Sequence, residues 1–184
     1  KGKTIIGYCF DLNSSIIRKN ALNLVKAFHD IRNNKENNLA LIIKYRLPRG
    51  NKFVNSLEER LFHEFIYISD ITKNIYLINE ELPLLDLYKL YTHFDYYISP
   101  HCGEGFGITI YDNMILGNKI ISPYYSGEKD YLERDKIIEL KYKETIVEEL
   151  KVHPIYGQMT DFKAAYVSVD SIKNTIINLN KNDL

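Results

Sequence analysis

Short apolar runs alternate along this chain with longer stretches in which apolar residues recur every three or four positions. Short β-branched runs are typical of buried strands, and the wider spacing is typical of amphipathic helices. The predicted strands are residues 4–10, 39–44, 75–78, 96–98, 119–122 and 136–140. The predicted helices are residues 18–34, 54–66, 83–91, 108–116 and 171–179. Residues 124–132 are predicted to be a loop with a helical turn, and residues 141–163 give no clear prediction.

Two details of the predicted helices can be checked against a structure. Ser56 and Glu59 have the spacing of a capping box at the start of the second helix. Pro83 stands where a helix tolerates proline, in its first turn. Within the segment without a prediction, His153-Pro154 and Tyr156-Gly157 are typical of irregular structure.

Strands that alternate with helices predict an α/β fold: a Rossmann-like doubly wound parallel sheet in three layers, α/β/α. The right-handed crossover rule favours the strand order 3-2-1-4-5-6. In that order the switch point lies between the first and fourth strands, where ligands bind at the carboxyl ends. The loops after these strands, residues 11–18 and 99–107, are therefore predicted to flank one crevice.

The composition is that of one globular domain covering residues 1–184. Lys plus Arg equals Asp plus Glu at 24 each, so no overall electrostatic field favours binding to nucleic acid or to a membrane surface. Cys9 and Cys102 are too few for a disulfide framework, which favours a reduced, cytoplasmic setting. The chain starts without a methionine or a signal-peptide pattern, and we expect it to be part of a longer protein.

A glycine loop, Gly103-Glu104-Gly105-Phe106-Gly107, follows the fourth strand and opens a helix. Free backbone N–H groups and the helix dipole at such a point suit an anion such as a diphosphate. Glu104 would repel a phosphate, but a carboxylate accepts hydrogen bonds from hydroxyls. The loop therefore predicts a ligand with both phosphate and polyol, against the alternative of a tight turn without a ligand. The dinucleotide-binding fingerprint is not met, because the spacing is G-x-G-x-G and the loop does not follow the first strand.

Charged residues on the neighbouring segments extend this prediction. Asp112, eight positions after Glu104, could supply a second carboxylate, although acids are also common in the first turns of helices. Arg18 and Lys19 stand at the predicted start of the first helix, where cations oppose the dipole, and this indicates a role in binding diphosphate. Lys44 ends the second strand and could reach the same crevice or be solvated.

Other chemistries find less support. His101 could donate to a phosphate or sugar oxygen or be a polar loop residue, and Cys102 has no candidate base except His101. No group of His, Cys and Asp has metal-ligand spacing, and no metal is predicted. Aromatic residues are not interleaved with basic ones as in nucleic-acid binding proteins.

The stretch SPHCGEGFGITIYDNMILGNKII resembles the C-terminal, donor-binding domain of GT-B glycosyltransferases, specifically the retaining glycosyltransferase family 4 (glycosyl transferases group 1). Residues 104–107 match the family's Glu-Gly-Phe-Gly signature, and its second acid falls at Asp112 in place of Glu. IIRKNALNLVKAF resembles the family's first helix, with Lys19 at its diphosphate-binding lysine. Ser14 stands where the family usually has an Arg. The resemblance covers roughly residues 3 to 180.

The resemblance implies that a nucleotide-diphosphate sugar is the donor, that the reaction retains configuration and that no metal or other cofactor is required. Glu104 would contact sugar hydroxyls, Asp112 the ribose, and Lys19 the leaving diphosphate, with Glu104 and Lys19 as the catalytic residues. The implied donor-binding set is Arg18, Lys19, Glu104, Gly105, Phe106, Gly107, Ile108, Thr109 and Asp112. It also implies a missing N-terminal acceptor-binding domain, on the same or a partner chain, through which any peripheral membrane contact would be made.

Two other functions remain as alternatives. Ser14 and Asp112 also fit a degenerate glycosyltransferase-like module that binds or stabilises a partner without catalysis. An NAD-binding Rossmann domain is disfavoured, because Lys44 stands where such domains carry an acid.

Overall fold

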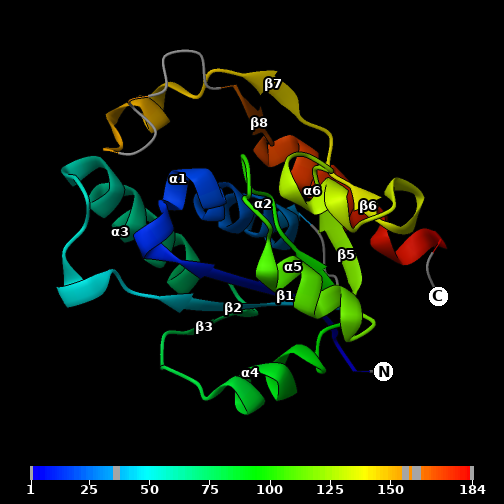
Figure 1. Cartoon of the computed structure of the whole chain (residues 1–184). Helices are drawn as coiled ribbons and strands as arrows, with labels where there is room; N and C mark the ends of the chain where they lie inside the picture. Colours follow the sequence, from blue (N-terminus) through cyan, green and yellow to red (C-terminus); the bar gives the residue numbers. More distant parts are fainter. Residues whose placement is uncertain (1, 35–37, 155–157, 159–162, 183–184) are drawn as a thin grey trace.

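A six-stranded parallel sheet forms the centre of the computed structural model, which describes residues 2–34, 38–154, 158 and 163–182 (Figure 1). Its strand order is β3-β2-β1-β4-β5-β6, and every neighbouring pair is parallel. The strands are β1 (Thr4–Asp11), β2 (Leu39–Arg46), β3 (Ile75–Ile78), β4 (Tyr96–Ile98), β5 (Lys119–Ser122) and β6 (Ile138–Glu139). The predicted doubly wound fold and its strand order are confirmed.

Helices cover both faces of this sheet (Figure 1). They are α1 (Ile16–Lys19), α2 (Ala21–Asn34), α3 (Ser56–Ile71), α4 (Leu84–Tyr91), α5 (Ile108–Ile115) and α6 (Val169–Asn182). Short 3-10 turns are η1 (Leu12–Ser14), η2 (Arg49–Asn51), η3 (Gly127–Asp130), η4 (Arg134–Lys136) and η5 (Glu148–Val152).

The alternation of side chains along β1 separates two apolar cores. Ile6, Tyr8 and Phe10 point into a core shared with α2, α3 and α6. Ile5 and Cys9 point the other way, into a core shared with α4 and α5. Because successive residues of a strand face opposite sides, one strand can contribute to both layers. The three-layer architecture predicted for the chain follows from this pattern.

The first predicted helix is interrupted. Asn20 adopts a left-handed conformation, with φ of 56°, and separates the four-residue α1 from α2. Asn is one of the few residues other than glycine that tolerate this conformation, which ends a helix. Arg18 and Lys19 therefore lie in the last turn of α1, so their predicted position at a helix N-terminus is wrong. Their role in binding diphosphate stays a prediction.

Other element boundaries also differ from prediction. The N-cap of α3 is Asn55, whose side chain accepts from Glu58 N, so the capping box predicted for Ser56 and Glu59 is wrong. Pro83 occupies the N-cap position of α4. The segment without a prediction contributes β7 (Lys143–Thr145), which pairs antiparallel with β8 (Ala164–Tyr166). Tyr156-Gly157 lies outside the described residues.

Candidate functional site

A buried carboxylate from α3 fixes the start of α1. Ser15 has φ of 79°, an unusual value for a residue other than glycine. Its hydroxyl donates to Glu58 Oε1 at 2.5 Å, and Ile16 N donates to Glu58 Oε2 at 2.8 Å. Glu58 is only 2% exposed, so both of its oxygens are satisfied by the loop that follows β1. This contact holds the unusual backbone at the entrance to α1.

The end of α1 is tied to the loop after β4. The Asn20 side-chain nitrogen donates to Pro100 O at 3.0 Å and to Val167 O at 2.9 Å. Cys102 N donates to Arg18 O at 2.7 Å, and the Tyr8 hydroxyl donates to Lys19 O at 2.7 Å. These bonds bring the two loops of the switch point together, as the strand order predicts.

Two ion pairs join the end of α1 to the glycine loop. Lys19 Nζ lies 2.5 Å from Glu104 Oε1, and Arg18 Nη1 lies 3.1 Å from Glu104 Oε2. Burial by itself would raise the pKa of Glu104, but Lys19 and then Arg18 outweigh it and hold the pKa below its ordinary value. Arg18 also donates to Gly103 O at 2.5 Å and to Ser14 O at 3.2 Å. Glu104 is therefore an ionised carboxylate between two cations.

The loop after β5 supports the glycine loop from the other side. Glu104 N donates to Ser126 Oγ at 2.8 Å, and Gly127 N donates to Glu104 O at 3.1 Å. The Tyr131 hydroxyl lies 2.8 Å from Phe106 O and 3.1 Å from Gly107 O. On the side of the glycine loop, all four contacts use only carbonyl groups and the N–H of Glu104. Throughout the described part of the chain, no protein group accepts a hydrogen bond from the N–H groups of residues 105–108. These four donors stay free at the start of α5.

Two pockets lie on either side of the Lys19–Glu104 ion pair. The first has a volume of about 420 Å³ and is lined at the ends of β1 and β2 by Cys9, Phe10, Asp11, Lys19, Lys44, Arg46, Glu81, Leu82, Leu87 and Thr109. The second has a volume of about 620 Å³ and is lined by Arg18, Gly103, Glu104, Gly105, Tyr125, Ser126, Lys129 and Lys163. The ion pair thus contributes its lysine to one pocket and its carboxylate to the other. We call them the Lys19 pocket and the Glu104 pocket.

The remaining predicted donor-binding residues lie on and around α5. Thr109 lines the Lys19 pocket, and its hydroxyl accepts from Tyr97 at 2.7 Å. Phe106 packs on Tyr131, with ring centroids 4.8 Å apart, and the Ile108 side chain is exposed. Asp112 lines neither pocket; its carboxylate hydrogen-bonds to Tyr88 of α4, and burial raises its pKa.

Several residues of these pockets were undervalued or missed by the sequence analysis. Lys44 is only 7% exposed and its Nζ donates to Tyr45 O at 3.0 Å, so the alternative of a solvated lysine is wrong. Lys129 and Lys163 were not predicted at all. The loop after β5 could have been flagged, because it leaves the same edge of the sheet as the loop after β4. No sequence signal marks Lys163.

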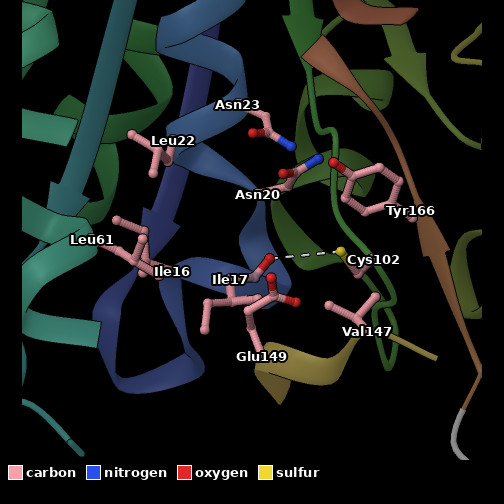
Figure 2. A pocket seen from close by; sticks show the side chains of 10 residues that line it. All are labelled: Ile16, Ile17, Asn20, Leu22, Asn23, Leu61, Cys102, Val147, Glu149 and Tyr166. Carbon is pink, nitrogen blue, oxygen red and sulfur yellow. Dashed lines mark hydrogen bonds between the residues drawn. The ribbon is translucent and has the colours of Figure 1, made fainter. Parts of the chain in front are cut away.

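His101 and Cys102 are both buried, and their side chains have different partners. His101 is a fully buried residue of the loop after β4, with Nε2 3.0 Å from Glu128 Oε1. The Cys102 thiol lies in another pocket of about 190 Å³, lined in part by Ile16 and Ile17 of α1, and its Sγ is 3.6 Å from Ile17 O (Figure 2). Burial raises the pKa of Cys102 to about 12, so the thiol is a poor nucleophile. None of the predicted donor-binding residues lines the pocket of Figure 2.

Two other features are absent from the described residues. No three His, Cys, Asp or Glu side chains among them are grouped so that they could hold a metal ion. None of the described helices combines the length and the apolar character needed to cross a membrane.

Comparison with known proteins gives structural matches only. No family model and no curated protein sequence matches the chain. A UDP-forming α,α-trehalose-phosphate synthase from Burkholderia xenovorans, solved with glucose-6-phosphate, superposes with a TM-score of 0.67 at 11% identity, over 100% of this chain and 37% of that one. A structure from E. coli bound with UDP-2-fluoro glucose superposes with a TM-score of 0.65 at 10% identity, over 99% of this chain and 37% of that one. An α,α-trehalose 6-phosphate synthase from Burkholderia multivorans superposes with a TM-score of 0.62 at 11% identity, over 96% of this chain and 34% of that one.

These matches establish the fold. The neighbours are GT-B glycosyltransferases, and the chain has the Rossmann-like fold of one half of such an enzyme. It spans about a third of the length of these structures. At such low identity the likeness does not extend to substrate or activity.

Proposed function

We propose that this chain is the donor-binding domain of a retaining, family 4-type glycosyltransferase, which transfers a sugar from a nucleotide-diphosphate sugar to a glycan, lipid or protein acceptor. The observation that carries the proposal is the Lys19–Glu104 ion pair between the two switch-point loops, with a pocket on each side. A phosphate group needs cations and N–H donors, whereas sugar hydroxyls need an acceptor such as a carboxylate. The two pockets supply these needs side by side.

In this proposal the nucleoside diphosphate occupies the Lys19 pocket. Lys19 and the buried Lys44 supply positive charge, and Leu82 and Leu87 supply apolar surface for a base. The free N–H groups of residues 105–108 adjoin the ion pair and donate to phosphate or sugar oxygens. As the bond to the sugar breaks, negative charge grows on the leaving diphosphate. Lysines and backbone donors fixed in place before reaction stabilise that charge.

The sugar then lies in the Glu104 pocket, with its hydroxyls toward the carboxylate. The remaining contacts to the acceptor come, in this proposal, from an N-terminal domain on the same or a partner chain, so the chain by itself binds donor but is inactive. The cytoplasmic setting, with any peripheral membrane contact through that domain, belongs to the same proposal. No metal is assigned a role, because Lys19 and the N–H groups perform the charge stabilisation.

Calorimetric titration with UDP, GDP and ADP in the presence of EDTA tests the proposal. One of the three is expected to bind, and Lys19→Ala is expected to weaken it roughly tenfold to a hundredfold, the loss of one hydrogen bond to a charged group. Lys26→Ala is the matched control, because Lys26 pairs with Glu64 and lines neither pocket. Absence of binding at millimolar concentration, or equal affinity of Lys19→Ala and wild type, would contradict the proposal.

A non-catalytic, degenerate module is the second candidate. Asp112 lies outside both pockets, and its carboxylate interacts with Tyr88. The Arg18 guanidinium donates hydrogen bonds to the carbonyl oxygens of Ser14 and Gly103. Both observations reduce the side chains available to a donor. If no nucleoside diphosphate binds while the chain remains folded by circular dichroism, this candidate is favoured.

A further inference from the structure

The Glu104 pocket carries an excess of positive charge. Among the described residues, its charged lining side chains are Arg18, Lys129 and Lys163 against one acid, Glu104, a formal balance of 3 − 1 = +2. Arg18 and Glu104 already contact one another. Lys129 and Lys163 are therefore the charges that require an explanation.

Tyr125 holds both lysines at the pocket. Lys129 Nζ lies 5.5 Å from the centre of the Tyr125 ring and 5.8 Å from that of Tyr124, within the range of cation–π attraction. The Tyr125 hydroxyl donates to Lys163 O at 3.0 Å and so fixes the backbone that carries the second lysine. Tyr125 itself is anchored by its N–H, which donates to the buried carboxylate of Glu128 at 2.8 Å. One aromatic residue thus connects two cations from distant parts of the sequence.

The acids that the structure describes near these lysines do not neutralise them. Within the described residues, neither Lys129 nor Lys163 has a carboxylate within ion-pair distance. Glu128 is buried against His101, and Glu144, the other acid whose charge acts on Tyr125, does not line the pocket. A cavity with a low-dielectric wall and unbalanced cations attracts an anion.

We propose that the Glu104 pocket binds an anionic sugar, whose carboxylate or phosphate substituent contacts Lys129 and Lys163 while its hydroxyls face Glu104. This inference rests on the proposed function, because it takes the ligand of Glu104 to be a sugar. A neutral hexose would fill the same volume and offer neither ammonium group an anionic partner. The anionic sugar belongs either to the donor, as the transferred unit, or to the acceptor.

The test begins with the nucleoside diphosphate that binds in the titrations above. Its glucose and glucuronate conjugates differ only at C6, where glucuronate has a carboxylate and glucose a hydroxymethyl group. The glucuronate conjugate is expected to bind about fivefold more tightly, as contacts with two exposed lysines allow. Lys129→Gln/Lys163→Gln should remove that preference and leave the affinity for the diphosphate unchanged. Lys52→Gln/Lys73→Gln removes the same charge from residues outside the pocket and should retain the preference.

A second arm distinguishes the source of the anion. Free D-glucuronate and D-glucose are titrated into the diphosphate-saturated chain by NMR. If the conjugates bind alike but free glucuronate is preferred in a Lys129- and Lys163-dependent way, the anionic sugar is the acceptor. If no preference is found in either arm, or both double variants lose it equally, the inference is overturned. Failure of every nucleoside diphosphate to bind would instead refute the proposed function, and free glucuronate would still test the pocket alone.

Discussion

Replacement of Gly127 by alanine places a methyl group in the contact that supports the glycine loop. A Cβ built on Gly127 would lie 1.7 Å from Gly105 O and 2.5 Å from Gly105 C. These are backbone atoms, so no side chain can turn away and one of the two loops must move. Overpacking of this kind costs roughly 1–3 kcal/mol. For a chain of this length, about 1 kcal/mol lowers Tm by roughly 2–4 °C, which gives an expected decrease of roughly 2–12 °C.

Thermal unfolding followed by circular dichroism measures this effect, and Gly105→Ala provides the control on the opposite side of the contact. A Cβ on Gly105 would meet nothing within 4 Å, and Gly105 is not among the residues with positive φ. Its Tm should stay within about 2 °C of wild type, as for a surface substitution that costs roughly 0.5 kcal/mol or less. A Gly127→Ala protein with the Tm of wild type would show that the two loops do not touch, and the support described for the glycine loop would be refuted.

Three further substitutions test other parts of the site. Glu58→Ala leaves the Ser15 hydroxyl and the Ile16 N–H buried without an acceptor, and urea unfolding should show a loss of about 2–4 kcal/mol, against little change for the exposed Glu59→Ala. Glu104 has a lowered pKa, so its contribution is complete above the unfolded value of about 4.3 and is lost as pH falls through the folded value. Urea titrations should therefore show a smaller loss below pH 4 for Glu104→Gln than for wild type. Asp112 has a raised pKa, so its ionisation lowers stability as pH rises above about 4, and Asp112→Asn should gain relative to wild type between pH 3 and pH 7.

Most of the central sheet could be predicted from the sequence, because its strands are continuous apolar runs separated by recognisable helices. Strand order then followed from general rules of chain crossover, and it brought the correct two loops together. The pair β7 and β8 could not be predicted, because the strands are three residues long and their pairing depends on contacts distant in sequence. The helix break at Asn20 could not be predicted either, because its side chain is held by the carbonyl oxygens of Pro100 and Val167, which are distant in sequence.

The site was predictable to the extent that its residues follow strands. Lys19 ends α1, directly after the loop that follows β1, and Glu104 belongs to the loop after β4. Their ion pair brings together the two segments that were predicted to flank one crevice. Lys129 depends on cation–π contacts with two tyrosines and on a 3-10 turn, neither of which has a signature in the sequence. Asp112, whose spacing from Glu104 suggested a shared ligand, lines neither pocket, and its contact with the ribose stays a prediction.

The ion pair between Lys19 and Glu104 has a consequence for which molecules the site admits. A simple anion such as inorganic phosphate must compete with Glu104 for the ammonium group of Lys19, and it meets the repulsion of that carboxylate at short range. A neutral sugar can donate hydrogen bonds to Glu104 but has no negative charge to pair with the Lys19 ammonium. Only a molecule that offers an anion to one partner and hydroxyl donors to the other can replace both halves of the pair at once. In the proposed function, the same contact that holds α1 to the glycine loop therefore disfavours simple anions relative to a nucleotide-diphosphate sugar.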